Sequence, residues 1–295
     1  MHYITIKRCQ NISSTMSVLK LFDAHCHLQD ARILERAPSL VATALSTGVN
    51  HFAVNGTSEL DWQLVKEMGE EYPSVVPCFG LHPWFIKERT PNWFTTLTNY
   101  FESTPSATVG EIGLDKGNHA KNIDFSDQVN VFRKQLILSK QMNKPASVHC
   151  VRAFGDLLEI LKETGPFPAG LILHSYMGSA EMVPEFANLG SYFSFSGFLM
   201  SMKTQKAKKM LKAVPSDRIL LETDAPDALP SARMDPFGES SVSDANKLLN
   251  HPANIHKVLR YIACLLDVSM DELAETTYNN AVRVFSFEGS KLCLF

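Results

Sequence analysis

The sequence lacks three features that would each point to a particular class of protein. No apolar run approaches the roughly 20 residues that a helix needs to cross a bilayer, so we expect no membrane partner. None of its six cysteines pair at zinc-finger spacing and nothing suggests a disulfide framework, which favours a reducing compartment. Basic charge is not in excess either, since the net charge is −3. The chain therefore has no overall positive field that would attract nucleic acid, although a small basic patch at a site remains possible.

Acidic residues are missing from the first 20 residues, which instead contain basic and hydroxyl side chains. That composition weakly resembles an organellar import segment, and a disordered extension or translation from Met16 explains it equally well. The remaining chain shows neither sequence repeats nor a low-complexity linker. We therefore predict a flexible extension over residues 1–20, one domain over residues 21–290, a cytoplasmic or nuclear location and no obligate protein partner.

Short apolar segments alternate with helical patterns along the whole domain. Such segments are typical of parallel strands buried on both faces, and eight strand–helix units predict an α/β fold of the TIM (β/α)8 barrel type. The expected strands are residues 18–22, 49–54, 75–79, 107–110, 145–148, 171–173, 192–195 and 219–221. The expected helices are residues 33–47, 58–72, 93–101, 125–142, 154–162, 181–189, 203–214, 256–266 and 270–285.

Two histidines stand two residues apart where the first expected strand ends, in the segment Asp23–His27. Side chains at i and i+2 of a strand point the same way, so the imidazoles of His25 and His27 should converge on one point. Neutral imidazole is the commonest metal ligand in proteins, although a single strand histidine is more often a packed core residue. Asp23 has the same parity and should accept an N–H from one of the rings.

Metal-binding side chains also follow four other expected strands. In a TIM barrel the carboxyl ends of all the strands meet at one rim, so these residues should lie together. Each could separately be a core histidine, a helix cap or an ion-pair member, but their shared rim favours a metal site. One four-coordinate ion needs fewer protein ligands, whereas two ions about 4 Å apart, bridged by Glu111, would use them all. The predicted ligands are His25, His27, Glu111, His149, His174 and Asp224.

Several other polar residues have plainer structural explanations. Strand alternation turns Cys26 and Cys150 away from the neighbouring histidines, so we interpret both as small buried apolar residues. The lysines within residues 203–212 face away from an apolar stripe, which indicates a solvated helix face rather than a DNA-binding surface. Trp84 could stack on a base or pack over the barrel rim.

The motifs together resemble the TatD family of metal-dependent nucleases, which belongs to the amidohydrolase-like barrels. The resemblance runs from about residue 22 to residue 287 and keeps the family's order, which makes it specific. It is carried by Asp23–Leu28, Gly80–Pro83, Gly110–Asp115, Ser147–Cys150, His174–Gly178, Glu222–Pro226 and Tyr278–Ala281.

The resemblance implies hydrolysis of DNA phosphodiesters, often exonucleolytic, by water that two divalent ions (Mg²⁺, Mn²⁺ or Zn²⁺) activate. It places the family's metal ligands on the same six residues and a histidine near the scissile phosphate at His82. We expect Asp224 and His82 to be catalytic, with Asp224 orienting or deprotonating the water. The substrate, DNA or RNA, should contact His82, Trp84, Ser175 and Arg152.

This chain departs from the family pattern in two places. Ser175 replaces a cysteine, and Asp227 stands where the family has an aromatic residue or leucine. The altered loop bears on the substrate more than on the chemistry. Alternatives are a small-molecule amidohydrolase or lactonase, an ester-cleaving deacylase of charged transfer RNA, and a catalytically silent binding protein, although no ligand is lost. Glu111, in place of a carboxylated lysine, favours the nuclease-like family.

Overall fold

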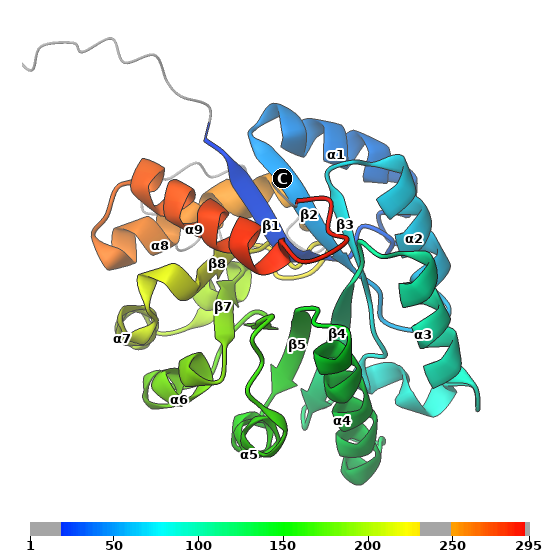
Figure 1. Cartoon of the computed structure of the whole chain (residues 1–295). Helices are drawn as coiled ribbons and strands as arrows, with labels where there is room; N and C mark the ends of the chain where they lie inside the picture. Colours follow the sequence, from blue (N-terminus) through cyan, green and yellow to red (C-terminus); the bar gives the residue numbers. More distant parts are fainter. Residues whose placement is uncertain (1–18, 231–248, 293–295) are drawn as a thin grey trace, which may run out of the picture.

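The computed structural model describes residues 19–230 and 249–292 (Figure 1). The extension expected over residues 1–20 falls almost entirely outside the described residues, as do residues 231–248, which follow the altered loop at Asp227. None of the helices in the described ranges is both long and apolar enough to span a membrane.

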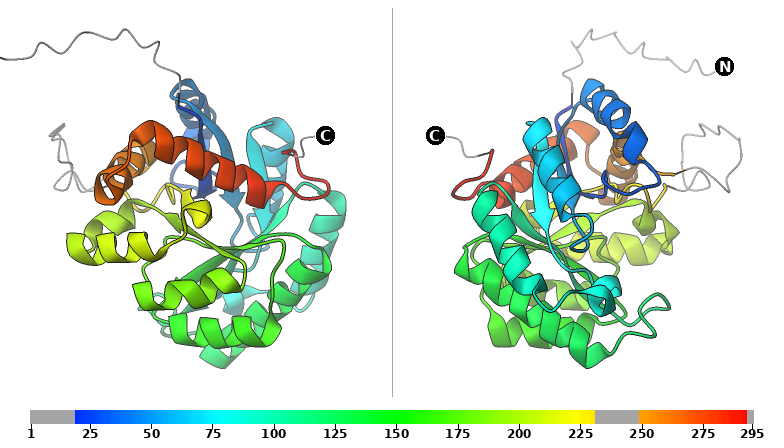
Figure 2. Two further views of the ribbon diagram at one scale, coloured as in Figure 1. Left: turned by 60° about the vertical axis from the view of Figure 1, so that its left-hand side comes forward. Right: turned by 90° about the vertical axis from the view of Figure 1, so that its right-hand side faces the viewer.

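Eight parallel strands form one sheet in sequence order, and the helices surround it, as the two turned views also show (Figure 2). This arrangement confirms the predicted TIM-type barrel. The strands are β1 (Leu21–Cys26), β2 (Val49–Asn55), β3 (Val75–Phe79), β4 (Thr108–Asp115), β5 (Ala146–Val151), β6 (Leu171–Leu173), β7 (Ser191–Phe195) and β8 (Ile219–Leu221).

The outer layer consists of helices that follow the predicted segments closely. They are α1 (Ala37–Ser46), α2 (Trp62–Glu71), α3 (Trp93–Ser103), α4 (Phe125–Gln141), α5 (Phe154–Thr164), α6 (Val183–Asn188), α7 (Thr204–Ala213), α8 (Ile255–Leu266) and α9 (Met270–Phe285). Short 3-10 turns precede some of them, including η2 (Pro83–Glu88) after β3 and η4 (Gly197–Ser201) after β7. On α7, Ala207, Met210 and Leu211 are buried while Lys206, Lys209 and Lys212 are exposed, which confirms the solvated lysine face.

Two strands extend further into the chemical motifs than we predicted. β1 begins at Leu21 and runs to Cys26, so His25 lies inside the strand rather than beyond it. β4 runs from Thr108 to Asp115 and therefore contains Glu111. The prediction was wrong because it used apolar runs alone, whereas both polar segments are held by ladder pairing with β2 and β5.

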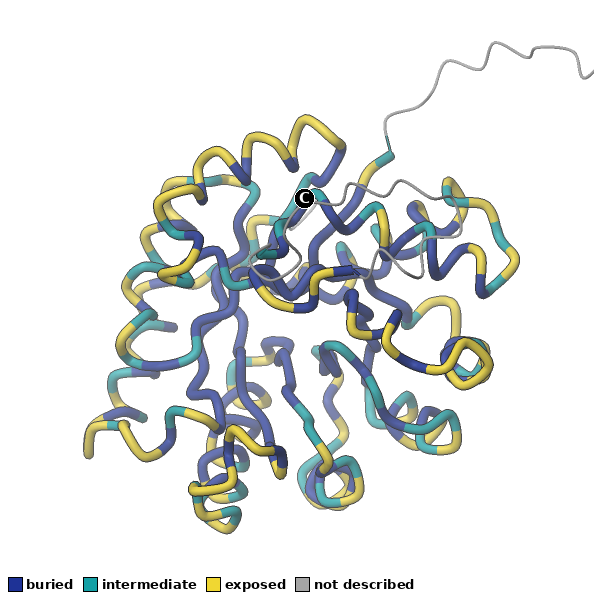
Figure 3. Tube along the Cα trace, turned by 180° about the vertical axis from the view of Figure 1, so that it is seen from behind, coloured by how far each residue is buried: buried dark blue, intermediate teal, exposed yellow. Residues whose placement is uncertain are grey.

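The buried core has two parts, and the burial pattern follows the strands (Figure 3). The larger part lies between strands and outer helices. The smaller part fills the barrel interior and includes Ala24, Ala53 and Leu220, covered by the side chains of α9. Phe285 of α9 stacks on Phe22 with ring centroids 4.8 Å apart, so α9 closes one end of the barrel and the polar rim occupies the other.

The barrel seam lies between its last and first strands. Each successive pair from β1–β2 to β7–β8 forms a parallel ladder, but within the described ranges no ladder joins β8 to β1. Two backbone hydrogen bonds just beyond β8 close the seam instead. Asp224 donates its N–H to the His25 carbonyl at 2.9 Å, and His27 donates to the Ala225 carbonyl at 2.7 Å.

Candidate metal centre

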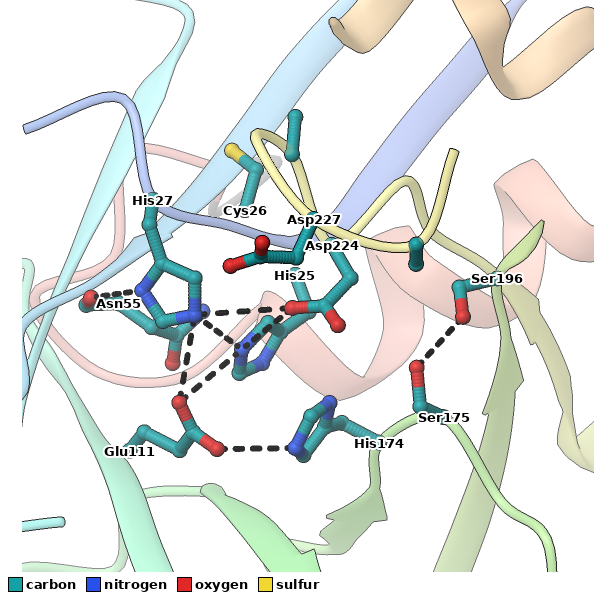
Figure 4. A network of polar contacts seen from close by, with 12 residues as sticks. His25, Cys26, His27, Asn55, Glu111, His174, Ser175, Ser196, Asp224 and Asp227 are labelled. Atoms are coloured by element: carbon teal, nitrogen blue, oxygen red, sulfur yellow. Dashed lines mark hydrogen bonds and ion pairs between the residues drawn. The ribbon is translucent and has the colours of Figure 1, made fainter. Parts of the chain in front are cut away.

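The structure brings all six predicted ligands together at the carboxyl ends of the strands. Figure 4 labels all of them except His149. The ligands come from several strands around the rim. His25 lies on β1 and His27 just after it, Glu111 lies on β4 and His149 on β5, and His174 and Asp224 follow β6 and β8. All except His27, which is partly exposed, are buried.

Glu111 lies at the centre of this cluster, with its two carboxylate oxygens facing different histidines. Its Oε2 lies 3.4 Å from His25 Nε2 and 3.3 Å from His27 Nε2. Its Oε1 faces three further ring nitrogens: His149 Nδ1 at 2.9 Å, His174 Nε2 at 2.9 Å and His82 Nε2 at 3.3 Å. A carboxylate placed between two sets of nitrogen donors has the arrangement of a bridging ligand.

Asp224 adds a second carboxylate beside His25 and His27. Its Oδ1 lies 3.8 Å from His25 Nε2 and 3.6 Å from His27 Nε2. The backbone of Asp224 is left-handed, with φ of 54°. Aspartate and asparagine tolerate this conformation better than most residues, so this position suits a short polar side chain.

The outer nitrogens of the two β1 histidines are held by groups on β2 and β5. His27 Nδ1 donates to the Asn55 carbonyl at 2.8 Å, and His25 Nδ1 lies 2.8 Å from Ser147 Oγ. Because the Nδ1 proton of His27 is directed at a carbonyl, the neutral ring presents its Nε2 lone pair to Glu111. Second partners of this kind set the tautomer and orientation of metal-binding histidines.

The other two ligand histidines are backed by carboxylates. His149 Nε2 lies 3.3 Å from Asp115 Oδ2, and His174 Nδ1 lies 3.6 Å from Glu222 Oε1. Asp115 and Glu111 both face His149 because Gly113 lets β4 approach β5 closely. A Cβ at Gly113 would lie 2.0 Å from the His149 carbonyl oxygen, which excludes any larger residue.

These contacts show that the donor set fits divalent metal ions. Imidazole nitrogens converge with two carboxylates, and each outer ring nitrogen of the ligand histidines has a polar neighbour. Nitrogen and carboxylate ligands together suit Zn²⁺ and also admit Mn²⁺ or Mg²⁺. Three groups of metal-binding side chains lie in this cluster, and the first two share His25: His25, His174 and Glu222; His25, His27 and Asp224; His82, Glu111 and His149.

The packed ionisable groups strongly perturb one another. Burial alone would raise the pKa of Glu111, but the charges of His82, His174 and His25 hold it well below its usual range. Burial disfavours the imidazolium of His27, yet hydrogen bonds to Asp224 and Glu111 outweigh burial and raise its pKa well above the usual range. The charge of Glu111 likewise raises the pKa of His174 despite burial.

His82 differs from the other histidines in its environment. Its Nδ1 accepts a hydrogen bond from the Trp84 backbone N–H at 3.1 Å, so the neutral ring carries its proton on Nε2, facing Glu111. Burial lowers the pKa of His82 to about 4, more than the charge of Glu111 can offset. The ring is therefore neutral at physiological pH in the metal-free protein.

The expectation that Asp23 would accept an N–H from a histidine ring was wrong. Its carboxylate instead accepts the backbone N–H of Thr223 at 2.8 Å and the Thr223 hydroxyl across the seam, with a longer 3.4 Å contact to the His25 backbone N–H. The neighbouring backbone satisfies this carboxylate, and Ser147 takes the ring nitrogen that we had assigned to it.

The expected substrate contacts occupy different positions. Ser175 turns its hydroxyl to Glu222 Oε1 and Ser196 Oγ, both at 2.6 Å, so it supports Glu222. Arg152 is exposed directly after β5, and no contact joins it to any other side chain within the described ranges. Trp84 is 38% exposed, and its indole N–H donates to Asp115 Oδ2 at 2.5 Å.

Sequence reasoning gave no role to several residues that orient the ligands. Asp115 and Ser147 were named only as parts of motifs, and the Asn55 carbonyl was given no role. Asp115 could have been predicted, because it lies four residues after Glu111 on β4 and therefore on the same face of the strand. A backbone carbonyl such as that of Asn55 has no signature in the sequence. Cys26 is buried as predicted, with its Sγ near the Ala53 carbonyl, whereas Cys150 is only half-buried and packs against the core.

Comparisons with known proteins agree with this geometry. A family model described as TatD related DNase matches residues 22–286. The metal-dependent hydrolase YabD of Bacillus subtilis, described as uncharacterized, is 31% identical over 265 residues, which cover 90% of this chain and 98% of the relative. The 3'-5' ssDNA/RNA exonuclease TatD of Erwinia tasmaniensis is 28% identical over 273 residues, covering 90% of this chain and 100% of the relative.

A solved structure extends the agreement to the fold. YjjV, a TatD homolog from Escherichia coli K12, superimposes with a TM-score of 0.78 at 24% identity, covering 91% of this chain and 98% of that one. The family match spans nearly the whole barrel, including every rim residue discussed above. This chain therefore belongs to the TatD-related DNase family and is a metal-dependent hydrolase.

Proposed function

We propose that the protein hydrolyses phosphodiester bonds of single-stranded DNA, and of RNA where the site admits it, from a strand end. The observation that carries the proposal is the position of Glu111, whose two oxygens face separate groups of histidines. The exonuclease name of a relative 28% identical over 273 residues supports the substrate class.

In this proposal Glu111 would hold one divalent ion together with His25, His27 and Asp224, and a second one together with His149 and His174. The ions, when bound, would supply Lewis-acid activation of the phosphate and of the attacking water. Asp224 would orient that water and accept its proton on the carboxylate.

His82 would donate its Nε2–H to a non-bridging phosphate oxygen. Its lowered pKa of about 4, caused chiefly by burial, supports hydrogen-bond donation by a neutral ring rather than proton transfer to the leaving oxygen. Trp84 stacks on exposed His119 with centroids 4.7 Å apart, and a base could extend this stack. Arg152, which is exposed at the rim, would pair with a backbone phosphate.

The test is metal-dependent cleavage of labelled single strands. The protein is stripped with a chelator, reloaded separately with Mg²⁺, Mn²⁺ or Zn²⁺, and given oligonucleotides labelled at either end. We expect mononucleotides to be released from DNA, and from RNA where the site admits it. No release from folded, metal-loaded protein would contradict the nuclease proposal, and cleavage of lactones or aminoacyl-tRNA esters would replace it.

Asp224→Asn is the matched variant for the water-activating role. Asparagine tolerates the left-handed backbone of this position, so the substitution removes charge with little strain. We expect activity to fall by about 100-fold or more, the range of general acid–base effects, while some metal is retained. Unchanged activity at equal metal content would contradict the role of Asp224.

A further inference from the structure

The loops after β1 and β8 fold into matching turns beside the seam. Asp30 donates its N–H to the His27 carbonyl at 3.0 Å, and Asp227 donates its N–H to the Asp224 carbonyl at 2.8 Å. Each turn therefore begins at a proposed metal ligand and ends on an aspartate three residues later. Figure 4 shows Asp227 close to Asp224 on the loop that follows β8.

One guanidinium joins the two turns. Arg32 donates from Nε and Nη2 to the two oxygens of Asp30 at 2.9 and 2.8 Å. It also donates from Nη1 and Nη2 to the two oxygens of Asp227 at 2.9 and 2.7 Å. Both contacts are bidentate, which is the geometry that a planar guanidinium provides and a lysine ammonium does not.

Arg32, Asp30 and Asp227 form a clamp, and it differs from an ordinary surface ion pair because it lies beside the barrel seam. Within the described ranges β8 and β1 share no strand ladder, so the seam depends on individual bonds. The backbone bonds of Asp224 and His27 and the Asp23–Thr223 pair join its two sides, and the Arg32 contacts add a link beyond them. His27 Nε2 and Asp224 Oδ1 face each other across that seam at 3.6 Å. A group that ties together the turns behind both residues can therefore control their separation.

We propose that Arg32 is a positioning residue that holds His27 and Asp224 at the spacing required by the metal ion they share. The inference rests on the proposed ligand set, and it concerns this chain in particular, because Asp227 is one of the residues that depart from the family pattern. Arg32 and Asp227 acquire no role in the chemical step itself. They act through the backbone turns that begin at His27 and Asp224.

The test measures the affinity of the full chain for Mn²⁺ alone, by calorimetry on chelator-stripped protein. We expect Arg32→Gln to weaken Mn²⁺ binding about tenfold, at the lower end of the effect of losing a supporting partner of a metal ligand. Arg32→Lys keeps the charge but cannot grip two carboxylates, so it should restore only part of the affinity. Asp227→Asn should weaken binding in the same direction.

A double-mutant cycle separates positioning from general destabilisation. If the clamp acts as one unit, Arg32→Gln combined with Asp227→Asn should cost little more than either change alone. Arg133→Gln, which breaks an exposed ion pair with Glu163 between α4 and α5, is the matched control and should leave Mn²⁺ affinity unchanged. An equal loss in this control, or unchanged affinity in both Arg32→Gln and Asp227→Asn, would overturn the proposal.

His27→Ala distinguishes failure of the clamp from failure of the ligand assignment. If His27→Ala weakens Mn²⁺ binding and Arg32→Gln does not, the clamp alone is wrong. If His27→Ala leaves Mn²⁺ binding intact, the ligand assignment is wrong and the clamp proposal falls with it. If the protein proves not to be a nuclease, the calorimetric test of metal affinity is unaffected, and the clamp proposal is still tested by it.

Discussion

Asp23 and Thr223 lie 200 residues apart in sequence and are joined across the barrel seam by two hydrogen bonds. The Asp23 carboxylate accepts the Thr223 backbone N–H at 2.8 Å and the Thr223 hydroxyl, and both residues are completely buried. These bonds align the end of β8 with β1, and the proposed ligands His25 and Asp224 follow immediately.

Removing the Thr223 hydroxyl should therefore destabilise the fold. Thr223→Val keeps the shape of the side chain but leaves a buried carboxyl oxygen without its partner, which costs about 1–3 kcal/mol. Urea unfolding of the metal-free protein measures the free energy of unfolding. Thr223→Ser retains the hydroxyl and should lose much less; equal losses for both variants would show that the hydrogen bond is not responsible.

Glu111→Gln should nearly abolish metal binding. Glutamine has the same shape but no charge, and the Glu111 oxygens lie within 3.4 Å of nitrogens from several histidines. We expect affinity to fall more than 100-fold, because losing an outer partner alone costs about 10- to 100-fold. Metal content after dialysis measures the effect, and a variant that retains both ions would contradict the bridging position.

Metal binding should release protons and tighten as pH rises. Despite burial, hydrogen bonds and charges from Glu111 and Asp224 raise the pKa of His27, and Glu111 also raises that of His174. In the metal-free protein, their stabilising contribution is complete below the unfolded histidine pKa of about 6.5 and is lost as pH rises through the raised folded pKa. Metal ions compete with these protons for the same nitrogens.

Calorimetry in buffers with different ionisation enthalpies counts the protons released on Mn²⁺ binding near pH 7. We expect net release, and an apparent affinity that increases with pH through the titration of these histidines. An affinity independent of pH between 6 and 8 would mean that neither ring is protonated in the metal-free site.

Asp115→Asn should weaken the site without removing a ligand. Burial would raise the pKa of Asp115, but hydrogen bonds from His149, Trp84 and the Gly117 backbone lower it to about 2, so its charge supports His149 throughout the physiological range. We expect a loss of about 10- to 100-fold in metal affinity or activity. Trp84→Phe removes the indole N–H and shortens the ring system but leaves the charge of Asp115 in place, so it should cost less. A larger loss for Trp84→Phe would assign the effect to Trp84 instead.

Much of the rim could be predicted because its signals are local. Eight apolar segments between helical patterns indicate a parallel barrel, and the carboxyl ends of parallel strands meet at one edge wherever their residues lie in sequence. The i, i+2 spacing of His25 and His27 at the end of one strand sets their common direction, and the Nε2–Nε2 distance of 3.2 Å agrees with it.

What the sequence alone could not provide is the choice among competing hydrogen-bond partners. Asp23 had the right parity to reach a histidine ring, but Thr223 lies closer once β8 meets β1. The support of His174 by Glu222 also depends on how strands from different parts of the chain pair. Parity limits which face a side chain occupies, whereas the partner depends on distances that only the packed barrel defines.

The sequence by itself determined the barrel class and the residues that gather at its rim, because strand periodicity and strand ends are local properties. Only the tertiary structure decided which ring nitrogen faces Glu111, which carboxylates hold the histidines, and how Arg32 ties the loops of β1 and β8 together. Those contacts join residues distant in sequence, and they form only when closure of the barrel brings the first and last strands side by side.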